Sequence, residues 1–370
     1  MNKFVIAGVA AAAVIIAAVL YFALGGAEKQ SITVVSWGGA YTKSQIEAYH
    51  KPFIAERDAS INSVDYDGDI ALVKAQVESA NVQWDIVDFE VADAIRACDE
   101  GLLEKLDLAD LPPAPDGTAA DRDFIPGALD PCYVATIVFS HIIAYDKTQF
   151  PTTPPTSARD FFDLAAFPGK RGLRRTSPKV NLELALLADG VPSSQLYTAL
   201  ATPEGVARAF AKLDSIKDQV VWWNAGAQPP QLLADGEVVM TTAYNGRIFD
   251  AMMDGKPFQI VWNNQLLDLD VWGIVKGSRN KALAWDFLKF STATPQLAEQ
   301  ARFIAYAPAR RSSIAIMEEK KITHVTRGVE MLPFMPTAPQ NYRDAVPINH
   351  RWWADRQDDL TERWNAWLAK

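Results

Sequence analysis

An alternation of strand-like and helix-like segments is the feature that most constrains how this chain can fold. Residues 32–35 read as a strand, 41–56 as a helix, 61–66 as a strand, 69–79 as a helix and 84–88 as a buried strand. A series of this kind predicts a mostly parallel sheet with helices on both faces. Ligands of open α/β sheets bind beyond the carboxyl ends of the strands, so we look for a site there.

A second alternating series follows a long apolar run. The run from Val134 to Tyr145 exceeds the length of a typical strand, and one strand passing between two lobes would explain it. Strand-like and helical patterns then alternate to about residue 262, and residues 269–275 read as a further strand. The predicted division is an export or anchor segment at 1–27, the first part of lobe 1 at 28–138, lobe 2 at 139–266, and the return to lobe 1 with C-terminal helices at 267–370.

The N-terminal segment predicts that the chain leaves the cytoplasm. Residues 5–24 are uncharged and almost wholly apolar, Lys3 precedes them, and small residues follow them. This pattern is typical of an export signal. A retained membrane anchor is the alternative, because the run is long enough to span a bilayer. Both interpretations place the remainder outside the cytoplasm, and we expect the periplasm.

The cysteine count bears on the same compartment. Cys98 and Cys132 are the only two cysteines of the chain. In an exported protein, an even count predicts a disulfide between them. Two buried free thiols are the alternative.

Charge and motifs exclude several classes of function. The formal net charge of −9 argues against nucleic acid as the main partner, since phosphate binding needs a basic surface. The nucleophile-elbow, phosphate-loop and His-Glu-x-x-His motifs are all missing, and the four histidines lack metal-ligand spacing. We therefore expect no cofactor, no metal and no catalysed reaction. An enzyme with a catalytic set assembled from distant positions stays the alternative.

Aromatic and charged residues instead cluster at the predicted strand ends. In Ser36-Trp37-Gly38-Gly39-Ala40-Tyr41, two glycines join a strand to a helix and let the backbone approach a ligand closely. Trp37 and Tyr41 flank this turn. If the two lobes face each other, the strand ends converge on one cleft. The other candidate binding residues are Glu90, Trp223, Tyr244, Arg247, Asp268 and Asp270.

These residue types predict an amine-bearing ligand. Aromatic rings bury methylene groups and attract an ammonium group, and carboxylates pair with its charge. Arg174 and Arg175 point the other way, because arginine binds carboxylate or phosphate in bidentate fashion. If they face the cleft, a zwitterion fits better than a pure cation. A solvated surface role is the alternative for both arginines.

Together, several segments resemble the bacterial solute-binding proteins of ABC transporters, most of all the spermidine/putrescine-binding type. The segments are the N-terminal apolar run, Ser36–Tyr41, the strand Trp84–Val87, Ala234–Val238 leading into Ala243–Gly246, and Tyr306–Pro308.

The resemblance implies a periplasmic binding protein fold of type II, with two α/β lobes joined by crossing segments. It implies a ligand-binding role for Trp37, Glu90, Tyr244, Asp268 and Asp270, and it draws attention to Tyr306. We expect a monomer that binds a polyamine or related amine and delivers it to an ABC permease of the inner membrane. The alternatives are a zwitterionic or acidic solute, such as an amino-acid conjugate, an opine or an organic acid, and, further away, an enzyme or an anchored sensor on the same scaffold.

Overall fold

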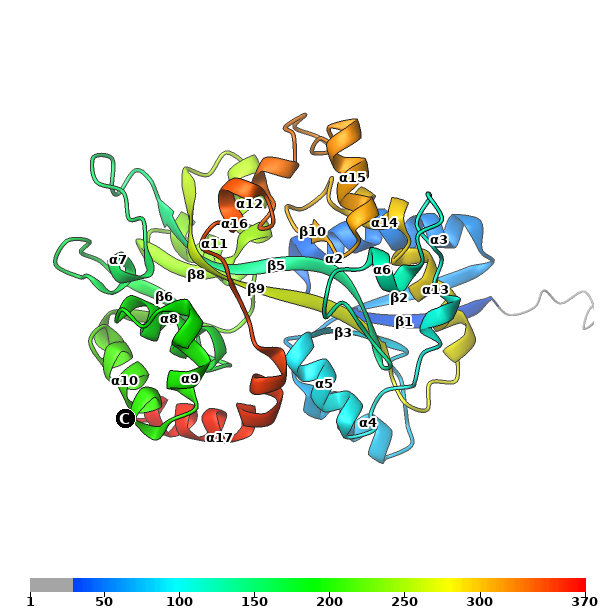
Figure 1. Ribbon diagram of the computed structural model, residues 1–370, viewed down its shortest axis with the longest axis horizontal. Coiled ribbons are helices and arrows are strands. Elements are labelled where there is room, and N and C mark those ends of the chain that lie inside the picture. The colour runs from blue at the N-terminus through cyan, green and yellow to red at the C-terminus, as the bar shows by residue number, and fades with distance from the viewer. Residues whose placement is uncertain (1–28) are drawn as a thin grey trace, which may run out of the picture.

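A mixed sheet of 11 strands runs through the computed structural model, which describes residues 29–370 (Figure 1). Its main order is β2-β1-β3-β9-β5-β8-β6-β7. The strands are β1 (Gln30–Ser36), β2 (Ala59–Asp65), β3 (Ile86–Glu90), β4 (Leu129–Asp130), β5 (Tyr133–Asp146), β6 (Arg171–Arg174), β7 (Val220–Trp223), β8 (Met240–Tyr244), β9 (Phe258–Ile274), β10 (Ala307–Pro308) and β11 (Val346–Pro347).

The sheet has a parallel part at each end and an antiparallel centre. Strand β1 pairs in parallel with β2 and β3, and β6 pairs in parallel with β7 and β8. Between them, the long strands β5 and β9 pair with each other in antiparallel fashion and run from one lobe into the other (Figure 1). This confirms the predicted two-lobed fold with crossing segments.

The structure corrects the prediction of two separate strands at residues 258–262 and 269–275. They lie in one strand, β9, because residues 266–268 are paired with β5; that pairing is interrupted only between Val261 and Leu266. Within this interruption, Asn264 has a positive φ of 56°. Asparagine tolerates this conformation, so the strand bends there without ending. The proposed lobe boundaries, 138/139 and 266/267, fall inside β5 and β9.

Helices cover both faces of the sheet. A π-helical turn, Ile46–His50, joins α2 to α3, so the predicted helix over residues 41–56 is interrupted only by this turn. The helices are α2 (Gly39–Gln45), α3 (Lys51–Glu56), α4 (Ile70–Glu78), α5 (Val91–Asp99), α6 (Ala120–Asp123), α7 (Ala158–Phe162), α8 (Lys179–Ala188), α9 (Leu196–Leu200), α10 (Pro203–Asp214), α11 (Gln228–Ala234), α12 (Asn245–Met253), α13 (Lys281–Ser291), α14 (Thr294–Gln300), α15 (Arg311–Lys320), α16 (Pro339–Tyr342) and α17 (His350–Leu368).

The C-terminal helix α17 contacts both lobes. Trp353 and Trp364 are fully buried in the core of the second lobe, as their helical spacing predicts. On the side of the first lobe, Arg96 of α5 donates to Asp358 of α17 at 2.7 Å. Helix α17 therefore connects the two lobes, packing on the second lobe and reaching α5 of the first (Figure 1).

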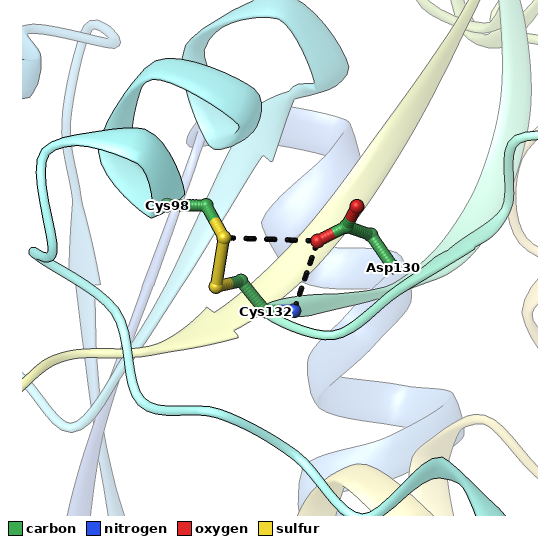
Figure 2. Close-up of side chains that lie close together, drawn as sticks. All are labelled: Cys98, Asp130 and Cys132. Carbon is green, nitrogen blue, oxygen red and sulfur yellow. Dashed lines mark hydrogen bonds between the residues drawn. A yellow bond between two sulfur atoms is a disulfide. The ribbon is translucent and has the colours of Figure 1, made fainter.

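The predicted disulfide between Cys98 and Cys132 is present (Figure 2). Cys98 lies near the end of α5, and Cys132 immediately precedes β5. The backbone N–H of Cys132 also donates to Asp130 Oδ1 at 3.0 Å. The disulfide therefore links α5 covalently to the start of the first crossing strand, β5.

The predicted export or anchor segment, residues 1–27, lies outside the described residues. Within residues 29–370, every helix is too short or too polar to cross a membrane.

Candidate functional site

A small cavity lies between the lobes, where the carboxyl ends of the parallel strands meet; the space open to the centre of a water molecule is about 40 Å³. The first lobe contributes side chains that follow β1, β2 and β3, and the second lobe contributes those that follow β6, β7 and β8. The crossing strands β5 and β9 form its floor. The lining residues are Trp37, Tyr41, Tyr66, Asp67, Glu90, Phe139, Arg174, Asn224, Ala225, Gly226, Tyr244, Arg247, Asp270 and Tyr306.

Two of the predicted binding residues do not line this cavity. Trp223 lies behind Tyr244, with 6.0 Å between the ring centroids. Asp268 is buried in an ion-pair network on the far side of Glu90. The structure brings the others together around one space, and their contact with a ligand stays a prediction: Trp37, Tyr41, Glu90, Arg174, Tyr244, Arg247, Asp270 and Tyr306.

Aromatic rings form much of the cavity wall. Tyr306 meets Tyr41 edge to face, with ring centroids 5.4 Å apart. Phe139 lies beside Tyr244 at 5.7 Å, and Trp37 packs against Tyr66 at 5.0 Å. Such rings offer apolar area to methylene groups and negative faces to a cation.

The glycine turn after β1 lets the second lobe approach the first. Gly38 and Gly39 have positive φ angles of 71° and 62°, a conformation that glycine adopts at little cost. A Cβ atom on Gly39 would lie 2.8 Å from Nη1 of Arg247. Nη2 of Arg247 donates to the backbone oxygen of Trp37 at 3.0 Å. The predicted strand, turn and helix are confirmed, and the turn receives an arginine from the opposite lobe.

The cavity contains a buried carboxylate that lacks a partner. Asp270 is 5% exposed, and within residues 29–370 its Oδ1 atom accepts no hydrogen bond. Burial raises the pKa of Asp270 well above its ordinary value, and the charges of Asp88, Glu90 and Asp268 raise it further. Because an unpaired buried charge is costly, this position favours a cationic ligand group.

Asp88 of β3 is a near neighbour of Asp270, on the same face of the sheet. Its Oδ2 atom accepts from Gln45 Nε2 at 2.7 Å and from the hydroxyl of Ser36 at 3.2 Å. Burial raises the pKa of Asp88 to about 7. The two acids therefore disfavour each other's ionisation until a cation binds.

The cavity also contains a guanidinium that no described carboxylate neutralises. Arg247 is 6% exposed, and it contacts the Trp37 carbonyl, the side chain of Tyr306 and the ring of Tyr244, whose centroid is 6.0 Å away. Nε1 of Trp37 is buried and likewise has no acceptor in the described part of the chain. These donors suit a carboxylate group of a ligand.

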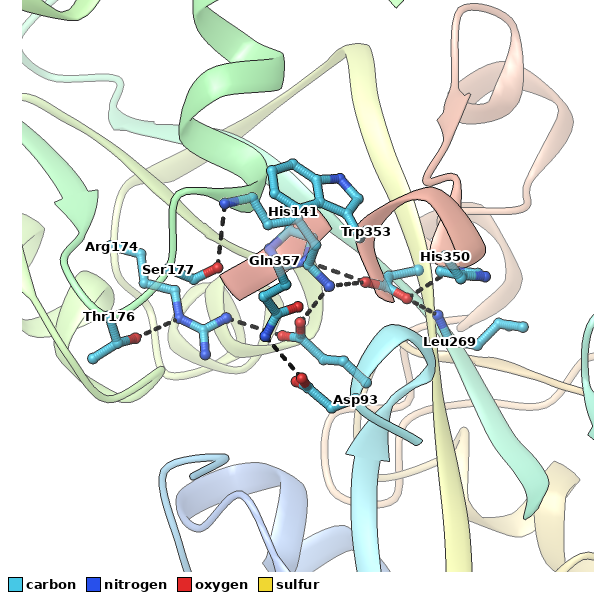
Figure 3. A network of polar contacts seen from close by, with 12 residues as sticks. Asp93, His141, Arg174, Thr176, Ser177, Leu269, His350, Trp353 and Gln357 are labelled. Atoms are coloured by element: carbon cyan, nitrogen blue, oxygen red, sulfur yellow. Dashed lines mark hydrogen bonds and ion pairs between the residues drawn. The ribbon is translucent and has the colours of Figure 1, made fainter. Parts of the chain in front are cut away.

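Glu90, in contrast, is neutralised by protein side chains, in the polar network that contains Arg174, His141 and His350 (Figure 3). Arg174 Nη1 donates to Glu90 Oε1 at 2.9 Å, and Lys179 donates to Oε2. Burial raises the pKa of Glu90, but the charges of Lys179 and Arg174 outweigh it and lower that pKa to about 2. Lys179 also donates to Asp268 at 2.8 Å, and His350 lies 2.9 Å from the same carboxylate. This network accounts for Asp268 being absent from the cavity wall.

Sequence reasoning missed several residues of the site. Tyr66 and Asp67 directly follow β2, just as Trp37 directly follows β1. The rule that ligands bind beyond the carboxyl ends of parallel strands therefore predicts them as well. The segment 224–226 follows β7 in the same way. Phe139 lies in the middle of β5, and Lys179 begins α8. No local signal marks either of them.

Comparisons of the sequence with known proteins identify the family to which the chain belongs. Residues 48–326 match the model of the family described as bacterial extracellular solute-binding protein. The chain belongs to this family. It is 43% identical over 350 residues to the gamma-aminobutyric acid-binding protein of Pseudomonas aeruginosa, an alignment that covers 95% of this chain and 94% of the relative. Solute-binding proteins of this kind serve ABC transporters, so the chain is an extracytoplasmic ABC solute-binding protein.

Two solved structures are similar over most of the chain. The protein MotA of A. tumefaciens B6, in complex with glucopine, is 31% identical with a TM-score of 0.83, covering 92% of this chain and 100% of its own. A GABA receptor structure is also 31% identical, with a TM-score of 0.78, covering 92% and 98%. A spermidine/putrescine-binding protein of Streptococcus pneumoniae is only 15% identical with a TM-score of 0.64, so it shows the fold alone. The polyamine prediction therefore gains no support from it.

Proposed function

We propose that this protein is the periplasmic binding component of an ABC importer and that its solute is a small zwitterion of the γ-aminobutyrate class. One observation carries the proposal. The cavity offers a carboxylate, Asp270, and a guanidinium, Arg247, neither of which forms an ion pair with an opposite charge in the described part of the chain. A solute with one ammonium and one carboxylate group supplies both missing charges.

The walls suit the rest of such a molecule. The rings of Tyr41, Tyr306 and Phe139 cover an aliphatic chain between the two charged ends. The small size of the cavity between the lobes restricts the solute to a small molecule. The relative from P. aeruginosa and one similar solved structure are both named for γ-aminobutyrate binding, which supports the same class of solute.

A polyamine suits the cavity less well than the alternative of a zwitterion. A diamine would neutralise Asp270 but would place its second ammonium group near Arg247 or Arg174. Like charges in a buried site repel strongly, because little solvent screens them. The proposal therefore takes up the zwitterionic alternative in place of the polyamine.

Binding of this solute would favour the closed arrangement of the lobes. Asp270 lies on a crossing strand, Trp37 on the first lobe and Arg247 on the second. A ligand that contacts all three interacts better with the closed form than with an open one, and so shifts the equilibrium towards it. We propose that the permease recognises this closed form.

Isothermal titration calorimetry with three compounds of matched chain length tests the proposal. We expect γ-aminobutyrate to bind at least about 100-fold more tightly than putrescine, which lacks the carboxylate, or glutarate, which lacks the amine. A factor of 100 corresponds to about 2.7 kcal/mol, within the range of a charge-assisted hydrogen bond. Equal or tighter binding of putrescine would contradict the proposal.

The raised pKa of Asp270 predicts that affinity increases with pH. An ammonium group pairs with the ionised carboxylate, so below the pKa of Asp270 binding must release its proton. Affinity should then rise by up to about tenfold per pH unit above pH 5, where the charges of the solute itself stay constant, until the raised pKa of Asp270 is passed. Calorimetry in buffers of different ionisation enthalpy measures the released proton, and a flat profile without proton release would contradict the prediction.

The same acids give the unliganded protein the opposite pH dependence. The pKa of Asp88 is raised to about 7 and that of Asp270 is raised as well. Each group therefore contributes stability below its ordinary pKa near 4, and this contribution is lost as the pH rises through the raised value. The γ-aminobutyrate-induced increase in melting temperature should accordingly grow from pH 5 to 8.

A further inference from the structure

We propose that Arg174 and Lys179 determine the charge specificity of the cavity by neutralising Glu90, so that the site accepts a solute with one ammonium group and not two. The inference rests on the proposed function. It adds a role for two residues, one of which, Lys179, does not line the cavity.

Glu90 and Asp270 are neighbours on the cavity floor. Strand β3 pairs with β9 in antiparallel register, and Glu90 lies directly opposite Asp270. Side chains of directly opposed residues point to the same face of a sheet, about 5 Å apart. Both residues line the cavity, and both are 5% exposed. Without other charges nearby, this pair would hold the two ammonium groups of a diamine.

Two cationic side chains neutralise Glu90, so its carboxylate is not free to bind a ligand. Arg174 Nη1 donates to Oε1 of Glu90 at 2.9 Å, and Lys179 donates to Oε2, so each oxygen of Glu90 accepts from a cation. The side chains of Glu90 and Lys179 are 6% and 3% exposed, so solvent screens this pairing little. Asp270 has no such partner in residues 29–370, so of this pair of carboxylates only Asp270 offers a free oxygen to a ligand.

The charge balance of the cavity follows from this pairing. Glu90 and Asp270 contribute two negative charges to the part of the wall that is shielded from solvent, and Arg174 and Arg247 contribute two positive charges; the third acid of the wall, Asp67, is exposed, so solvent screens its charge. A net neutral solute with separated charges matches this wall. Removal of the charge on Arg174 would leave the wall negative and favour a dication, and removal of the charge on Glu90 would leave it positive and favour a dianion.

The pairing also links specificity to closure. Glu90 ends β3 in the first lobe, whereas Arg174 ends β6 and Lys179 begins α8 in the second lobe. Separation of the lobes would part Glu90 from both cations. The discrimination against a second ammonium group is therefore exerted in the closed form.

Arg174→Gln tests the inference through a ratio of affinities. Calorimetry would measure dissociation constants of the wild type and the variant for putrescine and γ-aminobutyrate. We expect the ratio of the putrescine constant to the γ-aminobutyrate constant to fall at least about tenfold in the variant. Arg175→Gln is the matched control, because it removes the same charge from the next residue, whose side chain is exposed and outside the cavity. Arg174→Lys should keep the wild-type ratio, since it keeps the charge.

A second variant moves the specificity in the other direction. Glu90→Gln should raise the affinity for glutarate relative to γ-aminobutyrate by at least about tenfold. If Arg174→Gln does not fold, this variant tests the inference in its place. Ratios within about twofold of the wild type in a folded variant would overturn the inference. The wild-type measurement tests the proposed function by itself: failure of γ-aminobutyrate to bind would refute that function, whereas unchanged ratios in the variants would refute only the role of Arg174 and Lys179.

Discussion

Replacing Asp270 with asparagine is expected to weaken γ-aminobutyrate binding by at least about 100-fold. The ammonium group would lose its only charged partner in a buried site, and breaking such a pair costs about 3–5 kcal/mol. Asparagine has nearly the same shape, so the cavity should persist. The unliganded variant should melt at the same or a higher temperature, because the substitution removes a buried carboxylate whose raised pKa reports an unfavourable charge.

Calorimetry and thermal melts of Asp270→Asn check both expectations. Asp121→Asn provides the control, since Asp121 is exposed on α6 and lies outside the cavity. A variant at position 270 that binds γ-aminobutyrate as tightly as the control would remove Asp270 from the site.

Replacing Arg247 with glutamine is expected to weaken γ-aminobutyrate binding by about 100-fold while leaving the weak binding of butylamine unchanged. Butylamine has the same amine and a similar chain but no carboxylate, so it makes no use of the guanidinium. Glutamine can still donate to the Trp37 carbonyl that Arg247 contacts at 3.0 Å. The loss for γ-aminobutyrate reflects a charge-assisted, bidentate interaction that glutamine cannot replace.

The comparison of the two ligands separates a binding role of Arg247 from a structural one. A general distortion of the cavity would weaken both compounds alike, and that result would count against carboxylate recognition by Arg247. Arg327→Gln serves as the control, because Arg327 is exposed and pairs with Asp254 on the surface. It should bind both compounds as the wild type does.

Much of the fold could be predicted because its signals are local. The alternating apolar and amphipathic segments marked the strands and helices of both lobes, and the length of the run at Val134–Tyr145 indicated a crossing strand. The second crossing strand was less evident. Its polar residues 263–265 lie where the pairing with β5 is interrupted, and only the resumption of that pairing at Leu266 shows that the strand continues.

The site residues that lie at strand ends were predictable for a geometric reason. Carboxyl ends of parallel strands meet at one edge of a sheet, which brings Trp37, Glu90, Arg174 and Tyr244 together. The same rule, fully applied, would have included Tyr66. The rule could not indicate which of the candidate side chains points away from the cavity.

The two candidates that do not line the cavity illustrate this limit. Asp268 and Asp270 are two residues apart on β9 and share a face, but only Asp268 meets Lys179, which lies 89 residues away in the sequence. In the adjacent pair on β7, Trp222 packs against Trp364 of α17, while Trp223 lies behind Tyr244. Both outcomes depend on tertiary contacts that no local pattern encodes.

A crystal structure of the protein with bound γ-aminobutyrate would test the proposed binding mode. We expect the ligand nitrogen to lie about 3 Å from a carboxylate oxygen of Asp270 and the ligand carboxylate to receive hydrogen bonds from Arg247. The aliphatic chain should lie between the rings of Tyr41, Tyr306 and Phe139. A ligand bound with its carboxylate towards Asp270, or bound outside this cavity, would contradict the account.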